Sequence, residues 1–258
     1  MNTLSHIEDD SRRRVVRPLI GRLGGKSRVA TAIVGYFPPH KTYVEPMVGG
    51  GSVFFAKPRS EREVIADLDP RVVTLFRAAQ AGTKCKDEVA SQEAERKLIA
   101  QSSENACDIV AQLKCSFAKK GNHPSREADY PCKTDFPPEG KAERLQGVEI
   151  EQGDFRQTMK NGDSPQTLHY LDPPYVDTKN EYGPPHDKTL DNVKLEEVRS
   201  AALSMQGKVI ISYNDVPKVR EVFCKPDSGF QCHEIEQVIL GTSKGALGVR
   251  KDLVIIKD

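Results

Sequence analysis

The chain has 258 residues, of which 37% are hydrophobic and 29% are charged, and its formal net charge is +1. This length allows one large α/β domain with a smaller insertion. No apolar stretch approaches the roughly 20 residues that a membrane-spanning helix needs, and the start of the chain does not resemble a signal peptide, so we expect a cytoplasmic protein with no membrane partner.

The positive charges are concentrated in two stretches. Residues 11–44 contain eight basic side chains and no acid. Residues 109–126 also lack acids and contain four basic side chains, Lys114, Lys119, Lys120 and Arg126. Two such stretches in a nearly neutral protein are typical of a surface that contacts a phosphate backbone. The alternative for Arg12 to Arg14 is a solvated tail.

The six cysteines include no C-x-x-C pair. They are Cys85, Cys107, Cys115, Cys132, Cys224 and Cys232. With no secretory signal in view, we expect reduced thiols. A zinc site among the four central cysteines and His123 is the alternative, although their irregular spacing is unlike that of known zinc motifs, and no other metal is expected.

Helical and strand patterns alternate along most of the chain. Residues 1–17 lack periodicity and are expected to form a flexible basic arm. The predicted elements are, in order, helix 29–37, strand 42–44, helix 53–56, strand 64–66, helices 70–80, 87–101 and 105–117, strand 148–151, helix 156–160, strand 168–171, helix 195–205, strand 209–212, helix 217–223, and strands 232–240 and 252–256. Ser27 and Ser52 are the expected caps of the first two helices.

This alternation predicts an α/β fold with a doubly wound, mostly parallel, Rossmann-like sheet and a mixed edge. The stretch 82–146 differs, because its two helical runs are followed by a polar segment rich in proline and glycine. We therefore predict a main domain formed by residues 18–81 and 147–258, with residues 82–146 as a small helical insertion.

A glycine-rich loop follows the strand at 42–44. Gly49, Gly50 and Gly51 let the backbone approach a ligand closely, and the following helix start favours a carboxylate or a phosphate. The spacing matches neither the dinucleotide fingerprint nor the P-loop. Asp67 ends the next strand, 22 residues after Glu45, where an acid can bind ribose hydroxyls. The loop and this acid together predict an adenosine-containing cofactor.

Asp172-Pro173-Pro174-Tyr175 follows the apolar run 168–171 directly. Two prolines end a buried strand there, at the edge where open α/β sheets bind ligands. The Asp172 carboxylate and the Pro173 carbonyl can accept hydrogen bonds from a planar amine, while Tyr175 stacks on the ring that carries the amine. The alternative is a simple turn that leaves an acid exposed.

Two shorter motifs accompany these. Lys26, after Gly24-Gly25, can pair with a carboxylate, although the motif alone is also typical of a surface turn. Asp154 and Phe155 offer an acceptor and a ring to an adenine, although Phe155 alone would more often belong to the core.

Taken in order, Gly24-Gly25-Lys26, the segment 44–54, Asp67, Asp154-Phe155 and D-P-P-Y resemble the motifs of Dam-like, D12 class adenine-N6-specific DNA methyltransferases, whose fold is the Rossmann-like class I methyltransferase type. The resemblance implies S-adenosylmethionine as the cofactor. The cofactor-binding residues that it implies are Arg22, Lys26, Glu45, Pro46, Gly49, Gly51, Asp67, Asp154, Phe155 and Asp172. Arg22 stands where the family usually has an aromatic residue.

The resemblance also implies a catalytic pocket formed by Asp172, Pro173, Pro174 and Tyr175, which would receive an adenine flipped out of double-stranded DNA. The insertion 82–146 would read the site, with Lys114, Lys119, Lys120 and Arg126 on DNA. We expect site-specific methylation of the adenine N6 amine, in a restriction-modification setting, by a monomer or weak dimer. The alternatives are an RNA adenine-N6 methyltransferase and a catalytically silent nucleic-acid-binding module.

Overall fold

The computed structural model describes residues 16–21, 24–86, 88–100, 103–116, 131–176, 193–240 and 247–257. The predicted flexible arm, apart from Val16 and Arg17, lies outside these ranges. So do four predicted binding residues, Arg22, Lys119, Lys120 and Arg126.

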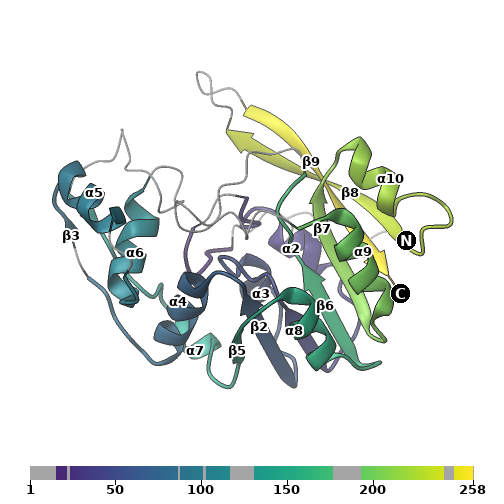
Figure 1. Cartoon of the computed structure of the whole chain (residues 1–258), viewed down its shortest axis with the longest axis horizontal. Helices are drawn as coiled ribbons and strands as arrows, with labels where there is room; N and C mark the ends of the chain where they lie inside the picture. Colours follow the sequence, from purple (N-terminus) through teal and green to yellow (C-terminus); the bar gives the residue numbers. More distant parts are fainter. Residues whose placement is uncertain are drawn as a thin grey trace, which may run out of the picture.

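A seven-stranded sheet forms the centre of the protein (Figure 1), in the order β5-β2-β1-β6-β7-β9-β8. The strands are β1 (Thr42–Glu45), β2 (Arg62–Asp67), β5 (Glu149–Gln152), β6 (Thr167–Leu171), β7 (Lys208–Asn214), β8 (Gln231–Leu240) and β9 (Leu247–Lys257). The first five strands in this order pair in parallel, and β9 runs antiparallel to both of its neighbours, β7 and β8. The predicted Rossmann-like, mostly parallel α/β sheet with a mixed edge is confirmed.

Helices cover both faces of this sheet. They are α2 (Ala30–Val34), α3 (Ser52–Ala56), α4 (Pro70–Gln80), α8 (Phe155–Gly162), α9 (Leu195–Ser204) and α10 (Pro217–Phe223). In β7, Val209, Ile211 and Tyr213 pack with α8, α9 and α10, whereas Ile210 packs in the cluster that includes α2, α3 and α4. A strand buried on both faces is rich in apolar residues, and the run Val209 to Ile211 in β7 shows this. Within the described ranges, no helix is long and apolar enough to cross a membrane.

The chain between α4 and β5 forms smaller elements, with α5 and α6 lying at the end of the molecule opposite α9 and α10 (Figure 1). These elements are β3 (Glu88–Val89), α5 (Gln92–Ala100), α6 (Ala106–Cys115), β4 (Cys132–Lys133) and α7 (Lys141–Arg144). Strands β3 and β4 pair antiparallel in a separate sheet. Ile109, Val110 and Leu113 of α6 belong to the same hydrophobic cluster as α4. The domain bounds 82 and 146 stay a prediction.

Two predicted helix starts are wrong. Ser27 does not cap α2, which begins at Ala30 without a side-chain cap, and its hydroxyl instead lies 3.2 Å from the hydroxyl of Ser52. Ser52 is the first residue of α3, and Gly51 precedes it with a φ of 74°. A Cβ at Gly51 would lie 2.9 Å from the Phe76 ring, so both the backbone angle and the packing require glycine there.

The predicted helix over 87–101 is also wrong at its start. Glu88 and Val89 pair with β4, and α5 begins at Gln92. The helical pattern of this polar segment gave no sign of that pairing, because the partner strand lies more than 40 residues further along the chain.

All six cysteines are paired, so the expectation of reduced thiols and its zinc alternative are both wrong. The disulfides are Cys85–Cys107, Cys115–Cys132 and Cys224–Cys232. The fold brings the paired Cα atoms to between 5.3 and 6.0 Å, a separation that a disulfide spans readily. These contacts are tertiary, which is why the spacing along the chain did not reveal them. Among the described residues no group of three or more His, Cys, Asp or Glu is arranged to hold a metal.

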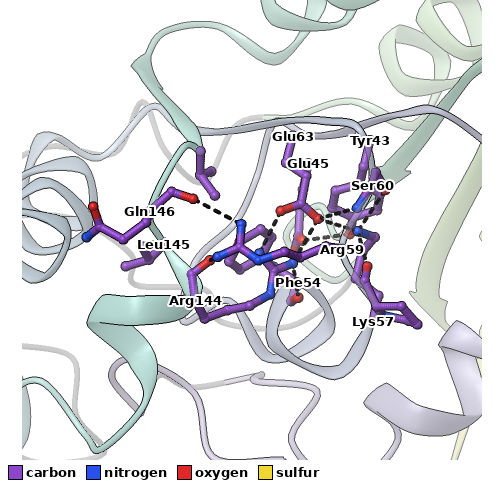
Figure 2. A network of polar contacts seen from close by, with 12 residues as sticks. Tyr43, Glu45, Phe54, Lys57, Arg59, Ser60, Glu63, Arg144, Leu145 and Gln146 are labelled. Carbon is purple, nitrogen blue, oxygen red and sulfur yellow. Dashed lines mark hydrogen bonds and ion pairs between the residues drawn. The ribbon is translucent and has the colours of Figure 1, made fainter.

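A buried polar network ties α7 to the main sheet (Figure 2). The Glu63 carboxylate of β2 accepts from Lys57 Nζ at 2.5 Å and from Arg144 Nη1 at 2.6 Å. The Lys57 ammonium lies 4.4 Å from the ring centroid of Tyr43, whose hydroxyl donates to Glu45 at 2.7 Å. The network therefore runs without a break from α7 to a predicted site residue at the end of β1.

Candidate active site

A single cavity opens at the carboxyl ends of β1, β2, β5 and β6, the edge where open α/β sheets bind ligands. All predicted catalytic residues and all described predicted cofactor residues line it. They are Lys26, Glu45, Pro46, Gly49, Gly51, Asp67, Asp154, Phe155, Asp172, Pro173, Pro174 and Tyr175. Segments that are up to about 150 residues apart in the sequence thus meet here, as the motif order led us to expect.

The polar groups converge because they share one face of the sheet. Side chains alternate between faces along a strand, and paired residues of neighbouring strands lie on the same face. Tyr43 pairs with Leu168, which places Glu45 on the face of Tyr170 and Asp172. Tyr170 pairs with Ile210, and Asn214 pairs with Asp252, which extends this face to Ser212 and to β9.

Asp67 organises the glycine loop. Its two carboxylate oxygens accept from the backbone N–H groups of Gly49 and Asp69, each at 2.9 Å. Behind the loop, a Cβ added at Gly50 would lie 2.4 Å from the carbonyl oxygen of Ile20, so the glycine is needed for close backbone packing. A carboxylate can accept more than two hydrogen bonds, so Asp67 is of a type that could also accept from a ligand hydroxyl.

Glu45 is a buried acid at the end of β1, with 2% of its surface exposed. Burial raises the pKa of its carboxyl to about 8, against the effect of the hydrogen bond from Tyr43, and the nearby Asp172 raises it further. At neutral pH this carboxyl is therefore mostly protonated in the ligand-free protein.

Asp172 forms a partly buried ion pair with Lys26, whose ammonium also donates to the Gly24 carbonyl at 3.2 Å. The Ser212 hydroxyl donates to the same Asp172 oxygen at 2.9 Å and lies 2.9 Å from the Tyr170 hydroxyl. Burial raises the pKa of the Asp172 carboxyl, and Lys26 opposes this rise. Lys26 and Ser212 thus orient one carboxylate oxygen and leave Oδ2 as an acceptor for a ligand.

Tyr175 is buried, and cations lie over its ring. The Lys26 ammonium is 4.5 Å and the Arg250 guanidinium carbon 5.2 Å from the ring centroid. The Tyr175 hydroxyl donates to Asp252 Oδ2 at 2.9 Å. The next residue, Val176, is held at both backbone groups by the Asn214 amide, at 3.2 and 3.0 Å.

Asp154 caps α8 and is bound by its neighbour. Its carboxylate accepts from the Arg156 guanidinium at 2.8 and 2.7 Å, and this hydrogen bonding keeps the pKa of Asp154 below its usual value. Phe155 is buried in the cluster around α8 and α9 while also lining the cavity. Of the predicted DNA-binding residues, only Lys114 is described; it is exposed on α6 and does not line the cavity.

Sequence reasoning missed Ser212, Asn214, Arg250 and Asp252 as contacts of the D-P-P-Y segment. The stretches 210–215 and 251–255, which hold these residues or adjoin them, carry no distinctive motif. The alternation of side chains along a strand, which places Ser212 and Asp252 on the same sheet face as Asp172, was the one sequence signal for these contacts.

The doubly wound sheet with a cavity at its carboxyl edge is a Rossmann-like arrangement. The chain matches the sequence profile of the D12 class N6 adenine-specific DNA methyltransferases over residues 23–106 and 106–239. These matches span most of the chain, which therefore belongs to this family of DNA adenine methyltransferases.

Among known relatives, the chain is 25% identical over 242 residues to a DNA adenine methylase of Haemophilus influenzae, covering 80% of this chain and 82% of the relative. Two solved structures also align with it. A precorrin-6y C5,15-methyltransferase of Geobacter metallireducens has a TM-score of 0.45 at 10% identity, covering 94% of this chain and 98% of that one. An rRNA methylase of Streptococcus thermophilus has a TM-score of 0.41 at 10% identity, covering 89% and 93%.

Proposed function

We propose that the enzyme transfers a methyl group from S-adenosylmethionine to the N6 amine of an adenine flipped out of duplex DNA. Family membership supports a methyltransferase with a methyl donor of this type. The observation that carries the proposal is the position of the Asp172 carboxylate, oriented by Lys26 and Ser212 in the same cavity as the Asp67 loop.

The residues of the cavity fit this cofactor. Its lining includes six acids and only two basic side chains. They are Glu45, Asp67, Asp69, Asp154, Asp172 and Glu197, with Lys26 and Arg156. Such a lining suits a ligand with a sulfonium and an ammonium group better than one with phosphates. Bound S-adenosylmethionine would supply an electrophilic methyl group, so the protein has mainly to orient the nucleophile.

In this proposal Glu45 and Lys26 hold the ammonium and the carboxylate of the methionine part, and Asp67 accepts from the ribose. Asp154 and Phe155 would bind the adenine of the cofactor. The Arg156 guanidinium, which now donates to Asp154, would then either move away or share the carboxylate with the adenine amine. At the target base, Asp172 Oδ2 and the Pro173 carbonyl accept from N6, while the Tyr175 ring stacks on the base. The N6 lone pair would take the methyl group that the cofactor supplies, the cofactor would leave as its thioether, and the proton that N6 then gives up would pass to solvent.

The proposal predicts that Asp172→Ala and Asp172→Asn abolish methyl transfer while cofactor affinity stays within about threefold, because the carboxylate acts on the base. Asp227→Ala, at an exposed site away from the cavity, is the matched control and should leave both quantities unchanged. Cofactor binding is measured by calorimetry and transfer by labelled methyl groups. A fall in cofactor affinity as large as the loss of transfer would contradict this role of Asp172.

The substrate is tested by offering duplex DNA, single-stranded DNA and RNA in parallel, followed by hydrolysis and mass analysis of the bases. We expect N6-methyladenine from duplex DNA. Label on RNA alone would contradict a DNA substrate, and no label on any substrate would favour a silent binding module.

A further inference from the structure

Asp252 of β9 is the group that fixes the D-P-P-Y tyrosine. Its side chain is fully buried, and it lies opposite Asn214 of β7 in the antiparallel register. The two residues hold consecutive positions of the same segment, since Asp252 accepts the Tyr175 hydroxyl and Asn214 holds the Val176 backbone. One cross-strand pair therefore anchors both the side chain of Tyr175 and the chain that follows it.

The direction of the hydrogen bond is set by charge. Burial raises the pKa of Tyr175 well above its usual value, and the nearby Asp172 and Asp252 raise it further. The hydroxyl is therefore protonated and donates to Asp252 Oδ2. Arg250 ties this anchor to the ring, because its guanidinium forms an ion pair with Asp252 at 3.2 Å and also lies over the ring face.

We propose that Asp252 is a positioning residue for methyl transfer, which fixes the position of the far end of the Tyr175 ring so that a flipped adenine stacks with its N6 amine at Asp172. The idea rests on the proposed function. A flipped base can stack on an aromatic side chain, and the position of the ring then sets the position of the base. Without the hydrogen bond the far end of the ring is held only by packing and by the cations over its face, and a misplacement of about 1 Å can cost up to roughly 100-fold in rate.

Four variants test the proposal: Asp252→Ala, Asp252→Asn, Tyr175→Phe, and the double variant Tyr175→Phe with Asp252→Ala. Asp252→Ala and Tyr175→Phe each remove the same hydrogen bond, so each should lower kcat on unmethylated genomic DNA by roughly 10-fold. Asp252→Asn keeps an acceptor oxygen and should retain most of kcat. Because both single changes act through one bond, the double variant should be no slower than the slower single variant.

Cofactor affinity and Tm serve as readouts for a merely structural role, and Asp227→Ala is the control. Unchanged cofactor affinity together with non-additive kcat losses supports positioning. The proposal would be overturned if the kcat loss of the double variant were the product of the two single losses. It would also be overturned if cofactor affinity fell by as much as kcat. If Asp252→Ala does not fold, the comparison of Asp252→Asn with Tyr175→Phe decides, because equal losses in these two variants would also overturn the acceptor role. Wild-type enzyme that methylates no DNA would instead reject the proposed function itself.

Discussion

At the scale of single residues, Glu45 combines an unusual protonation state with a position in the part of the cavity where we propose that the methionine part of the cofactor binds. Its pKa of about 8 means that the ligand-free protein holds a proton there at pH 7. A cationic ammonium group bound beside it would favour the ionised form and lower this pKa. The proposed function therefore predicts that cofactor binding is coupled to the release of a proton.

We expect binding of S-adenosylmethionine at pH 7 to release close to one proton, and affinity to rise with pH up to about 8, because the ionised carboxyl is the form that binds. Calorimetry in two buffers of different ionisation enthalpy measures this release. Glu45→Gln should nearly abolish it, and at pH 9 the wild-type protein should release much less. The same release from Glu45→Gln would show that the proton comes from another group.

Lys26 controls the ionisation of Asp172. Burial raises the pKa of the Asp172 carboxyl, and the Lys26 ammonium restrains this rise. Lys26→Met should raise the pKa further, so that the carboxylate is lost at a higher pH. The acidic limb of kcat against pH, measured at saturating cofactor, should then move to higher pH. Lys41→Met, on an exposed surface, is the control, and an unmoved limb in Lys26→Met would contradict the coupling.

At the scale of elements, the carboxylate of Glu63 joins α7 to β2 and α3. Burial alone would raise its pKa, but the hydrogen bonds from Arg144 and Lys57 lower it below the usual value. Arg62 and Glu149 form a comparable pair on the surface, where both side chains are nearly half exposed. Comparing the buried Glu63 ion pairs with the exposed Arg62–Glu149 pair shows how much burial changes the contribution of an ion pair to the free energy of unfolding.

Glu63→Ala should lower the free energy of unfolding by about 3–5 kcal/mol, because it leaves the buried Lys57 ammonium without its carboxylate. Glu149→Ala should cost under about 1 kcal/mol. Urea unfolding of both variants measures the difference. Equal losses would mean that the network around Glu63 contributes no more than a surface pair.

Sequence predictions succeeded where the structural cause is local. Helix α4 runs over the predicted range because Asp69 caps it and Pro70 suits its first turn, and Pro217 opens α10 in the same way. The motif residues of the cavity could be grouped because parallel strands all present their carboxyl ends at one edge. Predictions failed at Glu88, where pairing with a distant strand decided the conformation.

The contact between Tyr175 and Asp252 could not be predicted for the same physical reason. The two residues are 77 positions apart, and only the antiparallel insertion of β9 brings them together. Likewise, the hydrogen bonds from the Arg156 guanidinium to both oxygens of Asp154 cannot be seen in the helical pattern of the sequence.

At the scale of the whole molecule, the three disulfides close loops of different length, with sequence separations of 22, 17 and 8 residues. Restriction of the unfolded chain gives each about 2.5–3.4 kcal/mol, with the smallest effect for the shortest loop. Two of the disulfides lie between α4 and β5, and the third joins the end of α10 to β8.

We expect replacement of both Cys224 and Cys232 by serine to destabilise the protein less than replacement of both Cys85 and Cys107, as measured by urea unfolding under oxidising conditions. Alkylation of unreduced, denatured wild-type protein should label no cysteine. Labelled thiols, or an unfolding curve that does not shift on reduction, would contradict the pairing.

The insertion of β9 between β7 and β8 has a consequence for folding. Strand β7 pairs with β9 and not with β8, which follows it in the chain, so this edge of β7 stays open until the more distant strand β9 is available to pair. An open strand edge can pair with another chain, so this stage of folding is the one most exposed to aggregation. Asp252 belongs to β9, so the hydrogen bond between Tyr175 and Asp252 can form only after β9 has paired with β7.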